Sequence, residues 1–393
     1  MRVLQLHNHH ASLGGAMEVL AYEGALLRGD GHSVRSYTLP AAESLGLSSL
    51  RAGAKAIWNR DACQAVAREI IDFSPDVVHV HTPFPLLSPA VFRTAVRLGV
   101  PAVTTVHSFR YSCIAATCYR DNHVCEDCIG TRLKLPGLLH KCYHDSYAAS
   151  GALTTSLVLH KRLGTFDKSI SRFIALTDFA KQLLIRDGIP STHIAVKPNS
   201  VPDPGPEYVA QTPSQYVAFV GRLVNVKGVR VLLDAWRRAP AGFTLKIAGD
   251  GPMRTLVEER SALDPTIEYL GWLEEEAVTH LIASATCVVV PSEWYEGGVP
   301  LVVLRSLAVG TPVIVSDLDN ICADVLRDDA GAAFVTGDAD SLSHLLTSLM
   351  VEEERWTDRR SIARKAYEER YTPESNVASL TEIYRQVVAE GTR

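Results

Sequence analysis

The sequence of 393 residues has no long apolar run, no large net charge and no repeat of fixed period. A membrane-spanning helix needs about 18 or more apolar residues in a row, and no segment supplies them. The formal net charge is −5, so no basic field points to nucleic acid, which is not an expected partner. The N-terminus, MRVLQLHNHH, carries an apolar run too short for the core of a secretion signal. These absences together lead us to expect a cytoplasmic protein.

The apolar content is sufficient for two hydrophobic cores. Hydrophobic residues make up 47% of the chain and charged residues 21%, which is typical of a soluble folded protein, and the length exceeds one ordinary core. β-branched runs such as PDVVHVHTPF and PAVTTVHSF alternate with helical patterns such as residues 90–98. This alternation predicts parallel sheets covered by helices on both faces. We therefore expect an α/β protein with two Rossmann-like, doubly wound domains and a cleft between them.

The domain boundaries follow from composition. Residues 202–215, PDPGPEYVAQTPSQ, concentrate proline and polar residues between two apolar strands, as an interdomain linker does. The N-terminal domain is then 1–201 and the C-terminal domain 216–368. Residues 369–393 contain an amphipathic helix that we expect to pack back toward the N-terminal domain, and its apolar face holds Val377, Leu380, Ile383, Tyr384 and Val387.

Charged residues and glycines follow several of the predicted strands, where ligands bind in open α/β sheets. Arg222 and Lys227 come after YVAFV, and two cations beside a helix start form a plausible clamp for a diphosphate. Gly14 and Gly15 open a helix after the first strand, where free amides favour an anion. A solvated basic loop is the structural alternative for the cations, and ordinary turn chemistry explains the stretch GDGP at 249–252 better than catalysis does.

Glu296 follows the strand ATCVVVPS and precedes a helix that starts after Pro300. Its carboxylate can accept hydrogen bonds from sugar hydroxyls while the helix amides hold a phosphate. The alternative is a glutamate that only balances the helix dipole.

These motifs together resemble a known family. GRLVNVKGV, AGDGP and PSEWYEGGVPLVVLRSLAVGTPVIVSD, with the early glycine pair and HSF, are similar to the retaining, nucleotide-sugar-dependent glycosyltransferases of family 4, which have the GT-B fold. The resemblance implies sugar transfer to an acceptor hydroxyl with retention, in polysaccharide, glycolipid or glycosylated-metabolite biosynthesis. It implies a UDP- or GDP-sugar donor held mainly by the second domain. The first domain would hold a carbohydrate, lipid-linked or small-metabolite acceptor.

The resemblance also implies roles for single residues. Arg222 and Lys227 match the pair that neutralises the donor diphosphate, Glu296 matches the residue that hydrogen-bonds the transferred sugar, and His107 matches the histidine near the anomeric centre. The family pattern breaks at Arg305, where a second glutamate usually contacts the ribose. No metal or cofactor is implied for catalysis. Further donor contacts are expected at Gly14, Gly15, Gly249, Asp250, Gly251, Gly297, Gly298, Val299, Pro300, Leu301 and Arg305.

Two other functions fit parts of the sequence. A nucleotide-sugar 2-epimerase shares the architecture, but the inserted segment 108–165 favours a transferase, because an epimerase needs no acceptor-binding insertion. A catalytically silent sugar-nucleotide-binding protein is compatible with Arg305.

Histidines and cysteines raise the question of a metal. His79 and His81 share one face of a strand by the period of two, yet no third ligand is apparent, so cleft-lining residues are the preferred interpretation. Five cysteines fall between positions 113 and 142, including one CxxC. Cys113, Cys125, Cys128 and Cys142 could bind a structural zinc that orders the insertion, and reduced buried thiols are the alternative.

Residues 101–190 are locally basic in an acidic chain. They hold eleven Lys and Arg against seven Asp and Glu, a balance of +4. A basic, apolar acceptor domain could rest on the inner face of an anionic membrane, although chance placement explains the balance almost as well.

Overall fold

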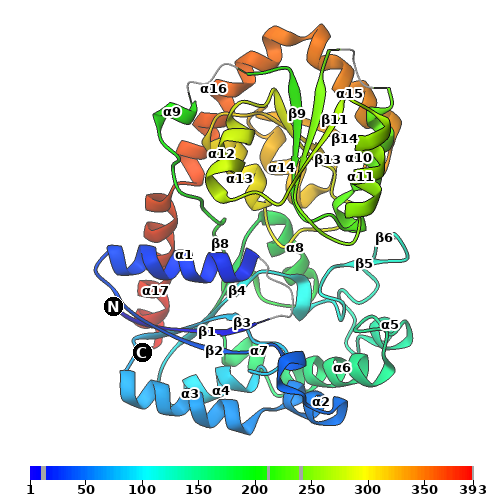
Figure 1. Ribbon diagram of the computed structural model, residues 1–393. Coiled ribbons are helices and arrows are strands. Elements are labelled where there is room, and N and C mark those ends of the chain that lie inside the picture. The colour runs from blue at the N-terminus through cyan, green and yellow to red at the C-terminus, as the bar shows by residue number, and fades with distance from the viewer. Residues whose placement is uncertain (10–14, 210–212, 239–241, 392–393) are drawn as a thin grey trace. The chain divides into compact units, whose positions relative to one another are not determined.

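The computed structural model describes residues 1–9, 15–209, 213–238 and 242–391 (Figure 1). The chain forms two compact units. The first contains residues 1–120, 125–198 and 376–393, and the second contains residues 121–124 and 199–375. The C-terminal segment thus belongs to the first unit.

The first unit is built on a six-stranded parallel sheet with the order β2-β1-β3-β4-β7-β8. Its strands form from the β-branched runs, which are buried on both faces as a doubly covered sheet requires. Val77 to His81 and Ala102 to Val106 are buried without exception. The strands are β1 (Arg2–Asn8), β2 (Ser33–Leu39), β3 (Val77–Thr82), β4 (Ala102–Val106), β7 (Arg172–Ala175) and β8 (Ile194–Val196).

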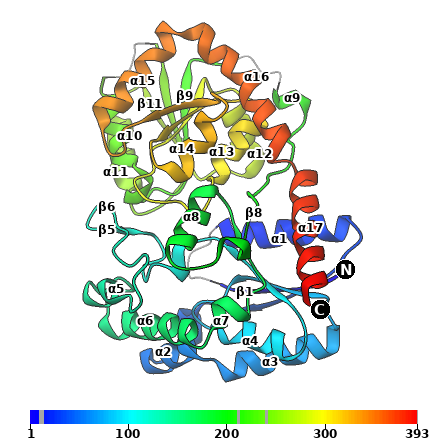
Figure 2. The same ribbon diagram turned by 180° about the vertical axis from the view of Figure 1, so that it is seen from behind.

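Helices cover both faces of this sheet (Figures 1 and 2). α1 (Gly15–Gly29) and α17 (Pro373–Gly391) lie on one face, and α3 (Arg60–Phe73) and α4 (Ala90–Arg97) on the other. The remaining α-helices and strands of this part of the chain are α2 (Ser49–Ile57), β5 (Tyr119–Arg120), β6 (His123–Val124), α5 (Leu135–Leu139), α6 (Tyr147–Arg162), α7 (Thr165–Lys168) and α8 (Asp178–Arg186).

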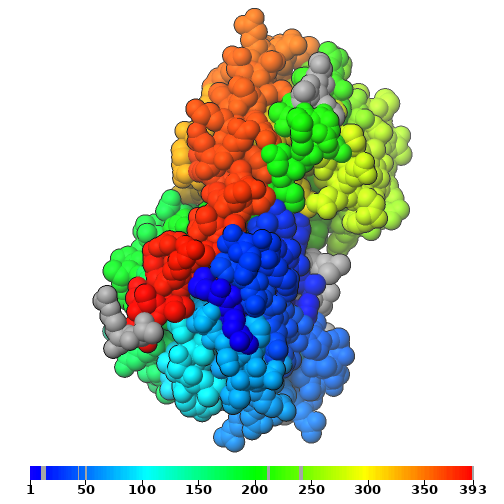
Figure 3. Space-filling view, turned by 90° about the vertical axis from the view of Figure 1, so that its left-hand side faces the viewer, coloured from blue at the N-terminus to red at the C-terminus, as the bar shows by residue number. Residues whose placement is uncertain are grey.

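The C-terminal helix completes the core of the first unit. Leu380, Ile383, Tyr384 and Val387 are buried in one cluster with Val3, Leu27, Val77, Val103 and Ile174. Val377 packs against the same cluster, so the predicted apolar face is confirmed. Figure 3 shows α17 in red alongside the blue N-terminal segment.

The second unit repeats the plan with the strand order β11-β10-β9-β12-β13-β14. Two buried clusters lie on its two faces, one around Val288 and Leu304 and one around Val289 and Leu342. Its strands are β9 (Tyr216–Val220), β10 (Thr244–Ala248), β11 (Ile267–Gly271), β12 (Cys287–Val290), β13 (Val313–Ser316) and β14 (Gly331–Phe334). Its helices are α9 (Pro206–Val209), α10 (Val229–Trp236), α11 (Arg254–Leu263), α12 (Glu275–Ala283), α13 (Leu301–Ala308), α14 (Asp319–Leu326), α15 (Ala339–Val351) and α16 (Glu353–Arg370).

Both sheets are therefore parallel and doubly wound, which confirms the predicted fold class. In the part of the chain that the structure describes, no helix combines the length and the apolar character that a bilayer crossing demands.

Candidate functional site

In the second unit, the loops after β9 and β12 approach each other closely. Gly228 has φ 68°, and a Cβ at this position would lie 1.8 Å from the carbonyl oxygen of Pro291. Only glycine fits here, because it lacks that atom and tolerates a positive φ. The backbone N–H of Glu293 also donates to the carbonyl of Val226, at 2.9 Å. This contact brings Lys227 and Glu296 to one place.

Lys227 and Glu296 form the charged centre of these loops. Lys227 Nζ lies 2.5 Å from Glu296 Oε1. Ser292 Oγ, at 2.8 Å, and Trp294 Nε1, at 3.0 Å, donate to the same oxygen. Burial alone would raise the pKa of Glu296, but the Lys227 ammonium and these hydrogen bonds outweigh burial and hold that pKa below its ordinary value. Glu296 is consequently an ionised carboxylate, and Oε1 receives all three of these hydrogen bonds.

The backbone around Glu296 is fixed by the next helix. Asn320, in the first turn of α14, donates from Nδ2 to the carbonyl of Glu296 at 2.7 Å. Gly298, Val299 and Pro300 are buried, Gly297 and Leu301 are partly exposed, and Pro300 precedes the first turn of α13. The predicted donor-binding stretch is thus a well-anchored loop at a helix start.

Arg222 belongs to the same loop after β9 as Lys227, and the turn at 249–251 contacts that loop. Arg222 is exposed in the loop after β9. Gly249 is packed so tightly that a Cβ would lie 1.9 Å from the carbonyl oxygen of Gly221, and Leu223 N donates to the carbonyl of Asp250 at 2.9 Å. Gly249, Asp250 and Gly251 therefore support the Arg222 loop through backbone contacts, as turn chemistry predicts.

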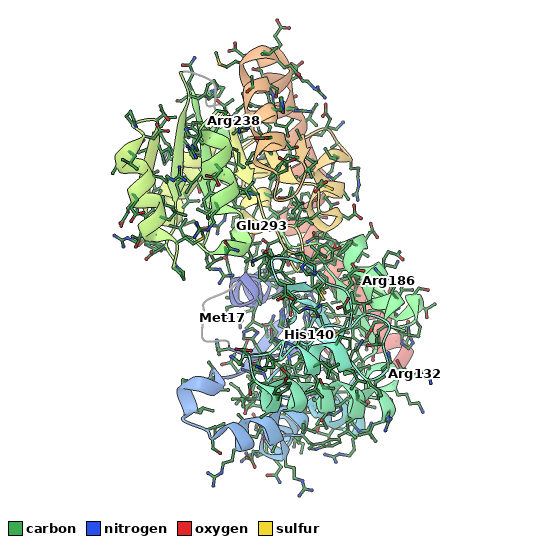
Figure 4. The ribbon with its side chains drawn as sticks, turned by 90° about the vertical axis from the view of Figure 1, so that its right-hand side faces the viewer. Met17, Arg132, His140, Arg186, Arg238 and Glu293 are labelled. Carbon is green, nitrogen blue, oxygen red and sulfur yellow. The ribbon has the colours of Figure 1, made fainter. Side chains whose placement is uncertain are left out.

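Figure 4 labels Glu293 at one end of the second unit and Arg238 at the other. Glu293 belongs to the loop after β12, next to the charged centre, whereas Arg238 pairs with Asp340. Arg238 is thus a suitable control for substitutions at Arg222.

Arg305, which departs from the family pattern, lies in α13. Its Nη2 is 3.3 Å from Glu275 Oε1 in α12. The substitution of the expected glutamate is therefore accommodated by an ion pair between neighbouring helices.

In the first unit, three histidines gather, His79 and His81 within β3 and His107 directly after β4. His81 Nδ1 and His107 Nε2 share a hydrogen bond of 3.0 Å, and their rings stack with centroids 5.3 Å apart. His79 bonds Tyr384 through Nδ1, at 2.7 Å, and Thr105 through Nε2, at 2.8 Å. The His79 and His81 rings lie 4.1 Å apart, which confirms that they share one strand face.

Two charged residues in this cluster were not predicted from the sequence. Glu23 in α1 and Lys197 after β8 form an ion pair of 2.5 Å between Oε1 and Nζ, with side chains only 2% and 1% exposed. Glu23 Oε2 also lies 3.9 Å from His81 Nε2. The available signal was an acidic residue on the apolar face of a helix, since Glu23 is spaced with Val19, Leu20 and Leu27.

The environment keeps the histidines neutral. Burial, followed by the neighbouring imidazoles and Lys197, lowers the pKa of His79 and of His81 well below the ordinary value. The pKa of His107 is lowered in the same way, and the nearby Glu23 only partly opposes the shift. The predicted catalytic histidine is therefore an uncharged ring.

The predicted glycine pair lies at the edge of the described chain. Gly15 is the first residue of α1, and Gly14 lies outside the described residues. Its predicted phosphate contact stays a prediction.

With two doubly wound parallel sheets, the chain has the architecture called GT-B. Solved structures with this architecture match its whole length. The HepE protein of Anabaena in complex with UDP has a TM-score of 0.69 and 17% identity, covering 98% of this chain and 100% of that one. Sucrose-phosphate synthase from Thermosynechococcus elongatus also has a TM-score of 0.69, with 15% identity and coverage of 99% and 100%.

Sequence comparison identifies the family. The family model "Glycosyltransferase Family 4" matches residues 1–203, and the model "Glycosyl transferases group 1" matches residues 214–352. The chain therefore belongs to glycosyltransferase family 4.

Curated relatives match smaller parts of the chain. The O-antigen chain mannosyltransferase B of Escherichia coli is 28% identical over 213 residues, covering 48% of this chain and 54% of that protein. A GDP-mannose-dependent α-(1-6)-phosphatidylinositol dimannoside mannosyltransferase of Mycobacterium tuberculosis is 33% identical over 162 residues, covering 40% and 41%. The chain spans about half or less of the length of the curated relatives it matches.

Proposed function

We propose that this chain transfers a hexosyl group from a UDP- or GDP-sugar to an acceptor hydroxyl with retention of configuration, in polysaccharide, glycolipid or glycosylated-metabolite synthesis. The observation that carries the proposal is the charged centre formed by Lys227 and Glu296 at the strand ends of the second unit. Support comes from the family, from structural neighbours solved with UDP and UDP-glucose, and from relatives named for mannosyl transfer.

The chemistry follows from where charge develops. When the sugar leaves, negative charge grows on the diphosphate, and fixed cations stabilise it without a metal. Arg222 and Lys227 would take this role. Glu296 would accept hydrogen bonds from the sugar hydroxyls, and donor binding would draw Lys227 away from Glu296 toward phosphate. In a retaining reaction the departing phosphate can itself accept the acceptor's proton. The neutral ring of His107 would lie near the anomeric carbon.

An acceptor site in the first unit is supported by a cavity between α2 and α6. Its volume is about 280 Å³, and most of its lining is small and apolar. Such a lining suits an apolar group better than a free sugar, which favours a lipid-linked or otherwise amphiphilic acceptor. The lining residues are Ala42, Leu47, Ala52, Gly53, Ala56, Pro85, Tyr143, His144, Ser146, Ala149, Ala152 and Leu153.

Peripheral contact with the inner face of an anionic membrane, and hence action in the cytoplasm, is the second part of the proposal. A cavity of about 880 Å³ along α3, α4 and α7 is lined by four cations, with no acidic residue among its lining. Trp58, Val96 and Leu163 line it too and are exposed. Cations beside exposed apolar side chains are suited to an anionic lipid surface. The four cations are Arg60, Arg93, Arg97 and Lys168.

Turnover of a donor panel tests the proposal. Hydrolysis and transfer are measured with UDP-, GDP-, ADP- and dTDP-sugars, with and without EDTA, and NMR identifies the anomer of the product. We expect turnover of one donor, a product that retains the anomeric configuration, and a rate that EDTA does not change. Glu296→Ala should lose activity, and Arg238→Ala should keep it. Conversion of the donor to its 2-epimer would instead identify an epimerase, and donor binding without turnover a silent protein. Either result contradicts the proposal.

A further inference from the structure

The segment 107–146 holds five of the eight cysteines and has little regular structure. It contains two strands of two residues each, β5 and β6, and the five-residue helix α5. Of the eleven non-glycine residues with positive φ in the described chain, eight lie in this segment. A positive φ is unfavourable for most residues other than glycine, so the segment needs a constraint beyond its secondary structure. The eight are Ala116, Cys118, Asp121, Asn122, Lys134, Lys141, His144 and Asp145.

Four of the five thiols line one small cavity. Its volume is about 10 Å³, close to the space that a single water or ion needs. Cys118 is not among the lining residues, and its thiol instead forms a hydrogen bond with Cys113. The lining consists of Cys113, Cys125, Cys128 and Cys142 with Ile114, Ala115, Tyr119, Arg120 and Ile129. We propose that these four cysteines bind one structural zinc ion, which holds together the stretches before β5, after β6 and after α5.

The backbone sets the four thiols around the cavity. Cys125 N donates to the carbonyl of Cys118 at 2.8 Å, and Cys142 N donates to the carbonyl of Gly137 at 3.0 Å. Gly137 leaves room for sulfur, because a Cβ there would lie 3.2 Å from Cys128 Sγ.

The structure describes all four side chains, and no three of their sulfur atoms lie within 4.8 Å of one another. Tetrahedral zinc requires S···S separations of roughly 3.8 Å, given Zn–S bonds of about 2.3 Å. The sulfur atoms must therefore move closer together when zinc binds.

The charge of the surroundings suits a zinc tetrathiolate, which carries a net charge of about −2. Arg120 lines the cavity, and the half-buried Arg110 guanidinium lies over the ring of Tyr143, 4.7 Å from its centroid. Zinc must displace the thiol protons, so its binding weakens as the pH falls.

A second group of possible ligands is less suited to a cation. The ligand atoms of Glu23, His79 and His81 lie within 4.8 Å of one another. However, Lys197 Nζ is already 2.5 Å from Glu23 Oε1, and both nitrogens of His79 are hydrogen-bonded. An added cation would meet an ammonium group and would have to displace Tyr384 or Thr105. The cation that lines the cysteine cavity, Arg120, is paired with Asp127 at 2.9 Å.

Metal analysis tests the zinc site. The full chain is purified without chelators, and its zinc content is measured by mass spectrometry after gel filtration. We expect about one zinc ion per chain in the wild type and loss of that zinc in the double variant Cys125→Ser/Cys128→Ser. The control Cys63→Ser, which changes a cysteine of α3 in the same unit, should keep its zinc. Retention is also expected in Cys118→Ser. Loss of zinc there would overturn the assigned ligand set.

Because the double variant could fail to fold, a second measurement uses the wild-type chain. Metal is removed with a chelator and Co²⁺ is added. We expect the intense visible absorption of tetrahedral cobalt thiolate, abolished by one equivalent of Zn²⁺. A wild-type chain that purifies without zinc and gives no such absorption would overturn the proposal.

Discussion

A lysine and a glutamate meet at 2.5 Å in each unit, but water reaches the two pairs to different extents. The side chains of Lys197 and Glu23 are 1% and 2% exposed, whereas those of Lys227 and Glu296 are 18% and 12% exposed. The first pair lies among neutral histidines inside its unit, and the second lies in a loop beside the exposed Arg222. The same kind of ion pair therefore lies in two different environments.

The burial of the first pair makes it structural. Removing one partner of a buried pair leaves an unpaired charge in a region of low dielectric constant, which is strongly unfavourable. In the proposed function the second pair exchanges partners with the donor, because an incoming phosphate can pair with Lys227 while solvent and sugar hydroxyls stabilise Glu296. Burial thus separates the framework of the first unit from the candidate donor site of the second.

The largest effect on stability is expected for Lys197→Met. It leaves Glu23 buried without a cation and should lower the free energy of unfolding by about 3–5 kcal/mol. The double variant Glu23→Gln/Lys197→Met should recover most of the loss, because neither charge remains. Chemical denaturation followed by fluorescence measures the free energy of unfolding of both variants.

The control is Lys246→Met, which breaks the more exposed pair with Glu268 (30% and 51% exposed). Its loss should lower the free energy of unfolding by less than about 1 kcal/mol. Equal costs for the two lysines would contradict the comparison.

The largest effect on activity is expected for Lys227→Ala. Loss of one preorganised cation at the leaving group should reduce the donor-dependent rate by about 100-fold. Lys227→Arg should retain more of the rate, because the positive charge remains. Steady-state kinetics with the donor found in the panel measures this. An unchanged rate in Lys227→Ala would remove this residue from the donor site.

The two units should also respond to acid in different ranges of pH. The pKa values of His79, His81 and His107 are lowered in the folded state, so below about 6.5, the ordinary histidine value, the unfolded chain binds more protons. The stability of the first unit is then complete above that pH and falls as the pH decreases. The pKa of Glu296 is also lowered, and its contribution falls only below about 4.3.

Hydrogen exchange at pH 7.0, 6.0, 5.0 and 4.0 separates the units. As the pH is lowered, protection of the backbone amides of β3 and β4 should decrease first, before protection of the amides in the loop after β12 changes. The reverse order would contradict the assignment of neutral histidines.

The smallest effect is expected for Arg305→Ala. The ion pair between Arg305 and Glu275 is partly exposed, at 28% and 71%, so its loss should change the free energy of unfolding by less than about 1 kcal/mol. Thermal unfolding measures the change. A loss above about 2 kcal/mol would show that this pair behaves like the buried one.

The sequence was sufficient to predict whatever depends on local pattern. β-branched runs predicted both parallel sheets, the spacing of Leu380, Ile383 and Tyr384 predicted the buried face of α17, and the period of two placed His79 beside His81. Lys227 and Glu296 each follow a predicted strand, and the structure brings them together, while the role of Arg222, Lys227 and Glu296 in donor binding stays a prediction.

Contacts between distant parts of the chain could not be predicted in this way. The Glu23–Lys197 pair joins residues 174 positions apart, and His81 meets His107 across two strands. Such pairs form only when the sheet order is known. Strand β14 has the sequence GAAF, and its alanines and glycine carry little strand signal. Trp294 and Ser292 reach Glu296 through the fold of one loop, which no periodicity describes.

The most direct test of the central claim, that the charged loops of the second unit bind a nucleotide diphosphate, is calorimetric titration with UDP and with GDP. The wild type, Arg222→Ala and Arg238→Ala are compared at one salt concentration. The account predicts that the wild type binds one of the two nucleotides. Arg222→Ala should bind that nucleotide at least about tenfold more weakly than the wild type, and Arg238→Ala should bind it as tightly as the wild type. Failure of both nucleotides to bind, or equal binding by all three proteins, would contradict it.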